Sequence, residues 1–208
     1  MKVFARYFSE NGLNFRVNTL LQFGTSFNVI GATVLINPGS ARPIAEVDSE
    51  TLPKLKEITG KDSDWKIFSA DSTMRFLEKI FNGSYVGTPK ELNGVVMLFN
   101  LFNLRDQNLE NALRLKDKCE SKLLFSAEDD LTLIEKAPKI YLGWGEAGKS
   151  QGLLPYAEKI FERVKNSQSY YLKSNFSDNR FYHPGYVNRS YNTNRFTKEI
   201  VVNFANNI

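Results

Sequence analysis

The run GVVMLFNLFNL, residues 94–104, decides the fold, because it stays apolar for almost its whole length. Such a continuous run is typical of a β-strand whose two faces are both covered by protein. Two further apolar runs flank it along the chain, GATVLI at 31–36 and KIYLGW at 139–144. A fourth and weaker strand is predicted from SQSYYLK, residues 167–173.

Helical patterns separate these strands, and they cover residues 49–59, 71–81, 107–117, 127–136 and 153–164. In the clearest of them Met74, Leu77 and Phe81 share one face, and Asp71 stands where a capping side chain is needed. Strands that alternate with helices predict a parallel sheet with helices on both faces. The expected fold class is therefore α/β, with three αβα layers around a central, mostly parallel four-stranded sheet.

The first 30 residues alternate in the manner of strands, as KVFARYF and NFRVNTLLQF, and predict an antiparallel hairpin that leads into the fold. The sequence shows no repeat, low-complexity tract or linker. We therefore expect the 208 residues to form a single α/β domain, 1–208, with the hairpin at 1–30 and the core at 31–190.

Composition limits the kind of protein. No run approaches the roughly 18 to 20 apolar residues that span a bilayer, and the start, MKVFARYFSENG, lacks the features of a signal peptide. We therefore expect no membrane partner and a cytoplasmic location. Cys119 is the only cysteine, which leaves no intrachain disulfide and no cysteine set for zinc or an iron–sulfur cluster. We expect no metal site and no cofactor, and the sequence leaves the oligomeric state open.

The ends of the predicted strands indicate where a ligand-binding site lies. Ligands of open α/β sheets bind at the carboxyl ends of the strands. Here those ends open into loops that begin at Asn37, Asn100, Trp144 and His183. We expect these four loops to converge on one cleft.

The stretch GWGEAGKS, residues 143–150, satisfies the phosphate-loop pattern G-x-x-x-x-G-K-[ST]. A working loop wraps phosphates with glycine amides and takes magnesium with its serine and with an aspartate after a nearby strand, for which Asp106 is the best candidate. Trp144 and Glu146 would crowd and repel the anion. We interpret the pattern as a coincidence at a strand–turn–helix junction, and keep a nucleotide-triphosphate enzyme as the third hypothesis.

The segment from Arg163 to Lys198 holds seven basic residues against one acid, Asp178, and eight aromatic residues are interleaved with them. Cations that meet phosphates, together with rings that stack on bases, favour a nucleic-acid surface. The alternative is a solvated basic tail whose aromatic side chains pack on the core. The composition of the segment does not decide between the two.

Five short motifs in order resemble the uracil-DNA glycosylase superfamily, and in particular its mismatch-specific branch. The resemblance covers about residues 30–190. Its motifs are INPGS (36–40), KIFSADSTMRFLEKIF (66–81), GVVMLFNLFNL (94–104), KIYLGWGEAGKSQG (139–152) and HPGYVNRS (183–190). The resemblance implies a DNA glycosylase or a nucleobase-recognising protein, with DNA or a nucleobase-containing ligand as its partner. The alternative is a non-catalytic nucleic-acid or nucleotide-binding module.

The same resemblance implies roles for single residues. Asn37 would position the attacking water and His183 would donate a hydrogen bond to the oxyanion that forms on the base. Tyr186 or Val187 would fill the space left by a flipped base. The residues implied to bind substrate are Pro38, Gly39, Ser40, Phe68, Asn100, Trp144, Tyr186 and Arg189, with Phe68 stacking on the base, Asn100 reading its polar edge, and Ser40 and Arg189 meeting phosphates.

Structural alternatives and departures accompany these roles. Asn37 before Pro38 also suits a turn, Phe68 suits a core, and Trp144 suits packing at its turn. The superfamily's strongest first motif has an aspartate where this chain has Asn37, so slower hydrolysis is expected. NPGSA followed by an Asp-x-Thr at 71–73 also resembles a bacterial family of unknown function, where a helix cap is the first interpretation and a site the second.

Overall fold

The computed structural model describes residues 1–150 and 152–206. Within this part of the chain, one mixed sheet holds seven strands in the order β4-β5-β1-β2-β6-β3-β7. The strands are β1 (Lys2–Glu10), β2 (Leu13–Phe23), β3 (Val29–Leu35), β4 (Pro43–Glu46), β5 (Trp65–Phe68), β6 (Gly94–Asn100) and β7 (Ile140–Leu142). Only β6, β3 and β7 run parallel, and the other pairings are antiparallel. The α/β class is confirmed, whereas a mostly parallel sheet of four strands is wrong.

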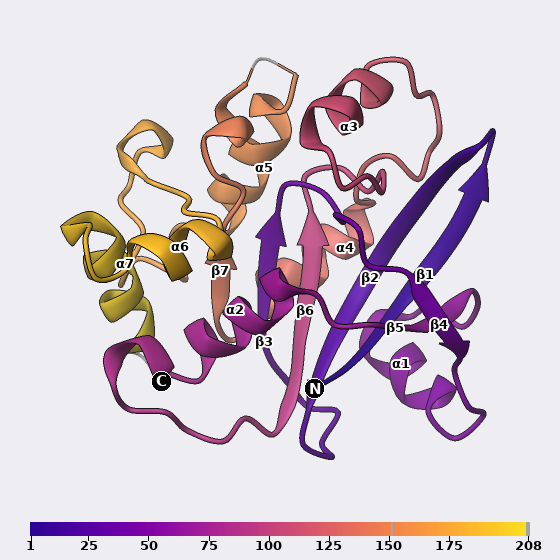
Figure 1. Ribbon diagram of the computed structural model, residues 1–208, viewed down its shortest axis with the longest axis horizontal. Coiled ribbons are helices and arrows are strands. Elements are labelled where there is room, and N and C mark those ends of the chain that lie inside the picture. Colours follow the sequence, from indigo (N-terminus) through magenta and orange to yellow (C-terminus); the bar gives the residue numbers. More distant parts are fainter. Residues whose placement is uncertain (151, 207–208) are drawn as a thin grey trace.

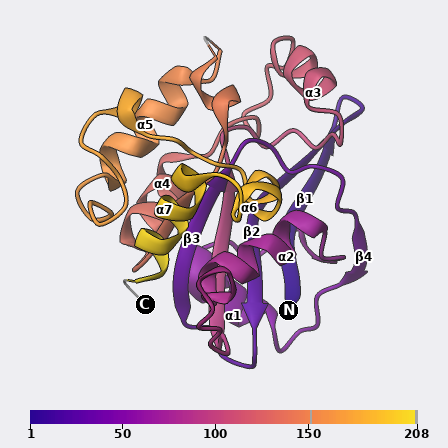
Figure 2. The same cartoon turned by 60° about the vertical axis from the view of Figure 1, so that its left-hand side comes forward.

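Helices cover both faces of the sheet (Figure 1). They are α1 (Leu52–Thr59), α2 (Ser72–Phe81), α3 (Leu109–Lys116), α4 (Glu128–Lys136), α5 (Leu154–Val164), α6 (Pro184–Ser190) and α7 (Arg195–Ala205). Buried side chains of α2, α6 and α7 form one apolar cluster with the sheet, and those of α1, α3, α4 and α5 join the other. In Figure 2, α2 and α6 lie side by side on the near face. None of the described helices is long and apolar enough to cross a membrane.

Strand β6 is the buried centre of the sheet. All seven of its residues are buried, as its apolar run predicts. Val95, Met97 and Phe99 face the α1/α4/α5 cluster, while Val96 and Leu98 face the α2/α7 cluster. Because its side chains enter both clusters, this strand joins the two cores. Full burial of each aliphatic side chain contributes about 1.5–3 kcal/mol to folding.

The N-terminal hairpin forms as predicted, but it is part of the main sheet. Its turn at Asn11 and Gly12 has positive φ at both residues (51° and 76°), as a tight two-residue hairpin requires. Strand β2 then pairs antiparallel with β6, Thr19 opposite Leu98. The start of β2 therefore lies beside the end of β6, and Phe15 bridges to Leu104 beyond that end.

The strand predicted at SQSYYLK is wrong, because residues 166–171 form turns. Two side chains from this segment bond the free edge of β7 instead. The Gln168 Oε1 accepts from the Ile140 amide (2.9 Å). The Tyr171 hydroxyl accepts from the Leu142 amide (3.1 Å) and donates to the Ile140 carbonyl (2.8 Å). These bonds satisfy backbone groups that a further strand would have paired.

Replacing Tyr171 with Phe tests this edge. The variant leaves the buried Leu142 amide without an acceptor, so the free energy of unfolding should fall by about 1–3 kcal/mol. Urea unfolding measures the loss. Tyr156→Phe is the matched control, because Tyr156 is exposed and its ring stacks on Phe125. Equal stability of the two variants would show that the edge needs no side-chain partner.

Candidate functional site

A pocket of about 470 Å³ lies where the carboxyl ends of the parallel strands meet the start of α2 and α6. This strand-end pocket is lined by residues from segments far apart in the sequence. Its polar lining consists of Arg16, Asn37, Asp71, Thr73, Gln107, Glu146 and His183. Leu35, Leu98 and Trp144 form apolar parts of the pocket wall. Its volume falls within the range of roughly 300–1,000 Å³ that is usual for small-molecule sites.

The structure brings together five of the residues that sequence analysis selects. They are Asn37, Pro38, Gly39, Trp144 and His183, and all of them line the strand-end pocket. The loops after β3 and β7 therefore meet, as the strand-end rule predicts, and His183 joins them from the start of α6, which directly follows no strand of the described chain. The loop that follows Asn100 contributes Gln107 in place of Asn100 itself.

Phe68 and Asn100 lie outside this lining. Phe68 is 3% exposed at the end of β5 and packs edge-on against Tyr7, so it belongs to the core and its ring has no free face for a base. Asn100 is 2% exposed, and its Oδ1 has no hydrogen-bond partner in the structure. Alternation along β6 puts Asn100 on the same face as Leu98, but only Leu98 lines the pocket.

Ser40, Tyr186 and Arg189 also lie outside the lining. Ser40 is exposed, and its carbonyl oxygen accepts from Arg105 Nη2 (2.6 Å). Tyr186 stacks on Tyr182 with ring centroids 5.0 Å apart and lines a neighbouring pocket of about 350 Å³. Arg189 is exposed and acts on the site through its charge.

A hydrogen bond from its side-chain amide fixes the orientation of Asn37. Its Nδ2 donates to the Asp106 carbonyl oxygen (2.9 Å), which fixes the orientation of the side chain. Asp106 is fixed in turn, because its carboxylate accepts from the Asn108 amide (2.8 Å) and from Asn111 Nδ2 (2.5 Å). Asn37 Oδ1 is the atom left to accept a hydrogen bond from a ligand or a water molecule.

His183 caps the start of α6, where a loop was expected. Its Nδ1 accepts from the Gly185 amide (3.1 Å), and Pro184 occupies the first helical position. Burial lowers the pKa of His183; Asp71 opposes this shift and Arg189 adds to it. The imidazole is therefore neutral at pH 7, with the proton on Nε2.

Arg16 is the charged lining residue that sequence reasoning missed. It comes from β2, is 2% exposed, and its Nε and Nη1 have no hydrogen-bond partner. Burial lowers the pKa of Arg16 to about 10, with Asp71 opposing and Arg105 adding to the shift, so the guanidinium stays charged at neutral pH. Its carbon lies 5.7 Å from the centre of the Phe68 ring. The signal was present as one charged residue in an otherwise inward-facing strand.

Trp144 is a packing residue with one unused donor. It is 1% exposed and lies against Phe181, with ring centroids 4.6 Å apart. A Cβ at Gly148 would come within 2.1 Å of the indole, so glycine is required there. The indole Nε1 is buried and has no hydrogen-bond partner. Trp144 is therefore, with Arg16, a pocket residue that has an unpaired buried donor.

Two glycine amides of the GWGEAGKS loop form hydrogen bonds within the protein. Its middle forms a short 3₁₀ helix, Glu146–Lys149. The Gly145 and Gly148 amides donate to the carbonyl oxygens of Phe181 (2.6 Å) and Gly145 (3.4 Å). Lys149 Nζ lies 3.5 Å from Glu146 Oε2. These two amides and the lysine are thus paired with other groups of the protein, which fits the interpretation of the pattern as a coincidence.

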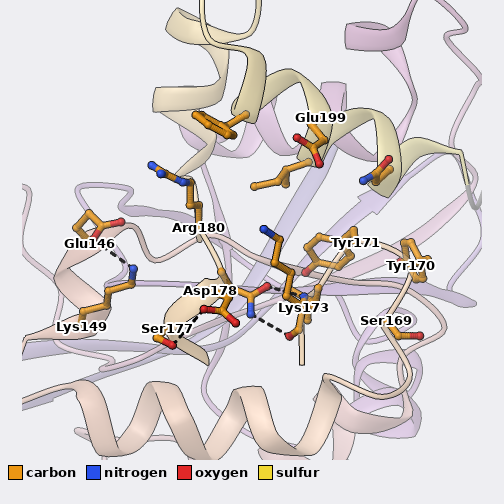
Figure 3. A pocket seen from close by; sticks show the side chains of 15 residues that line it. Glu146, Lys149, Ser169, Tyr170, Tyr171, Lys173, Ser177, Asp178, Arg180 and Glu199 are labelled. Carbon is orange, nitrogen blue, oxygen red and sulfur yellow. Dashed lines mark hydrogen bonds and ion pairs between the residues drawn. The ribbon is translucent and has the colours of Figure 1, made fainter. Parts of the chain in front are cut away.

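A larger opening of about 720 Å³ lies between α7 and the segment around residues 169–180 (Figure 3). The charged side chains that line it are Lys149, Lys173, Arg180, Glu146, Asp178 and Glu199, so basic and acidic groups balance. Most aromatic side chains of the basic segment pack inward; Tyr186 and Phe196 are the exposed large ones, and Phe196 has Arg180 and Arg195 at 4.7 Å from its ring. The balance of charge does not favour a polyanion here.

Two further observations concern metal binding and similarity to known proteins. Among the described residues, no group of three or more His, Cys, Asp or Glu side chains is arranged to hold a metal ion. No protein-family model, curated protein or solved structure shows significant similarity to the chain. The geometry of the strand-end pocket therefore carries the functional argument.

The only histidine of the chain allows a direct test of these electrostatics. NMR titration should place the pKa of His183 below its ordinary value of about 6.5. Asp71→Asn should lower it further, because it removes the charge that raises it, and Arg189→Ala should shift it upward. A pKa above 6.5 in the unmodified protein would contradict the burial described here.

The same shift predicts how stability changes with pH. The unfolded chain takes up the proton of His183 first as the pH falls, since its pKa is higher than that of the folded protein. The contribution of His183 to the free energy of unfolding should therefore decrease as the pH drops below about 6.5. Comparing urea unfolding of the unmodified protein and His183→Gln at pH 7.5 and 5.5 isolates this term, and an identical difference at both pH values would contradict it.

Proposed function

We propose that the strand-end pocket binds a nucleobase-containing ligand, and that the protein hydrolyses N-glycosidic bonds in the manner of the uracil-DNA glycosylase superfamily. One observation carries the proposal. Asn37 and His183, the two residues for which the resemblance implies catalytic roles, line the same pocket although they come from opposite ends of the chain.

The chemistry that such a pocket would perform is limited by its side chains. The oxygen of water forms a bond to the anomeric carbon of the sugar while the carbon–nitrogen bond to the base breaks. The bonding electron pair leaves with the base, and the proton released by water neutralises the base. Asn37 Oδ1 would orient the water, and the neutral His183 would donate from Nε2 to an oxygen of the departing base.

The amide at position 37 limits the rate. The Asn37 side chain is an amide, so it orients a water molecule without taking its proton. Stabilisation of the charge on the base is then the main source of acceleration. Slow turnover is expected, in line with the aspartate that the superfamily's first motif has and this chain lacks.

A second candidate function, binding without catalysis, rests on the same observation. With an amide at the water position, the pocket is equally suited to hold a nucleobase or nucleotide without cleaving it. Binding without release of base distinguishes this second candidate. DNA is the proposed macromolecular partner of the first, whereas the second requires only the nucleobase-containing ligand.

An oligonucleotide assay tests the first candidate. Single- and double-stranded DNA that carries deaminated or mismatched bases should be nicked after alkali treatment. His183→Ala should reduce the rate on the order of 10²–10³-fold, since it removes a donor to the developing oxyanion, and Asn37→Ala should also reduce it. Asn166→Ala, at an exposed turn after α5, is the matched control.

The outcomes separate the two candidates. Base release that survives both Asn37→Ala and His183→Ala would place the chemistry elsewhere. Saturable binding of a nucleobase without release would establish the non-catalytic candidate. Neither release nor binding across a broad panel of bases would refute the proposal as a whole.

A further inference from the structure

The buried guanidinium of Arg16 is the strongest sign of a ligand anywhere in the described chain. Two of its donor nitrogens, Nε and Nη1, are out of contact with solvent and have no hydrogen-bond partner. Buried charged donors are normally satisfied, because an unmade bond costs the full desolvation of the group. Arg16 lies outside the segments that carry the resemblance to the glycosylases, and its side chain lines the strand-end pocket.

Asp71 places a carboxylate in the lining of the same pocket. Its Oδ1 accepts from the Met74 amide (2.9 Å) and caps α2, which fixes the carboxylate at the pocket wall. Asp71, Arg16 and His183 line the same pocket, and the charge of Asp71 raises the pKa of the other two against the effect of burial. Arg16 Nε and Nη1 form no hydrogen bond with Asp71, and the second carboxylate oxygen, Oδ2, remains as an acceptor.

The charges of the lining favour a neutral ligand over an anion. Arg16 is the one cation among the described residues that line the pocket, whereas Asp71 and Glu146 are both anionic and His183 is neutral. A phosphate or carboxylate bound to Arg16 would meet the Asp71 carboxylate as well. A neutral group that accepts at one atom and donates at the next would satisfy both side chains.

We propose that Arg16 and Asp71 form a specificity pair that reads the lactam edge, –NH–C(=O)–, of a planar heterocycle. The carbonyl oxygen accepts from the Arg16 guanidinium, and the adjacent ring N–H donates to Asp71. Held in the same orientation, an aminated base such as adenine presents the reverse order, an amino donor beside a ring-nitrogen acceptor, and leaves both side chains unsatisfied. Sites built on such bonds reject the wrong partner strongly, because their own groups stay unpaired.

This inference deepens the proposed function, since it names the class of base at the same pocket, but its test requires no cleavage. Isothermal calorimetry with free hypoxanthine and free adenine compares two purines that differ in this edge. Hypoxanthine should bind at least about 10-fold more tightly than adenine, as expected for one charge-assisted hydrogen bond gained and none left unpaired.

Two variants assign the preference to the pair. Arg16→Met keeps the length and apolar stem of the side chain and should weaken hypoxanthine binding at least about 10-fold. Asp71→Asn retains the helix cap but turns an amide N–H₂ toward the ligand, so the preference for hypoxanthine over adenine should disappear. Asn166→Ala should change neither affinity.

Stability supplies an independent measurement. Removal of an unpaired buried charge should leave the midpoint of thermal unfolding of Arg16→Met unchanged or higher. A structural role for Arg16 would lower that midpoint. A variant that is as stable as the unmodified protein yet no longer binds hypoxanthine supports the specificity pair.

Each other outcome overturns a defined part of the account. Equal binding of both purines, unaltered in Asp71→Asn, would refute the lactam pair while leaving nucleobase binding in place. Heat from inorganic phosphate that is lost in Arg16→Met, with none from either purine, would identify an anion site and refute both the pair and the proposed function. Base release from DNA without discrimination at this edge would refute the pair alone.

Discussion

A positive charge buried without a partner is the constraint on which the account of this protein depends. Arg16 reaches the pocket because β2 pairs antiparallel with β6, so the start of one strand lies beside the end of the other. The carboxyl ends of β3, β6 and β7 open at the same place. A wholly parallel sheet would have put the start of a strand at the opposite edge, away from the loops that bind ligands.

The electrostatics of the pocket follow from one shared neighbour. Asp71 caps α2, raises the pKa of Arg16 against the effect of burial, and does the same for His183. The result is a charged donor, a charged acceptor and a neutral imidazole in one pocket of small-molecule size. Such a set suits the polar edge of a neutral heterocycle, and Leu35 and Leu98 provide apolar surface for its faces.

Local patterns predicted much of the fold, because they depend on burial and capping alone. The run at 94–104 indicated β6, and Asp71 indicated the start of α2. The missing fourth parallel strand was not predictable, since Gln168 and Tyr171 replace its backbone bonds with side-chain bonds. Asn37 follows from the strand-end rule, whereas His183 reaches the pocket from the start of a helix that no strand of the described chain directly precedes. Arg16 depends on the pairing of β2 with β6, and Phe68 and Asn100 depend on which side chains the packing covers.

The central claim is that Arg16 and Asp71 hold the lactam edge of a base in the strand-end pocket. A crystal structure of the protein soaked with hypoxanthine tests this most directly. The account predicts the purine in that pocket, with its carbonyl oxygen within hydrogen-bonding distance of the Arg16 guanidinium and its ring N–H directed at the Asp71 carboxylate. A purine bound only at another surface, or in the pocket with this edge turned away from both side chains, would contradict it.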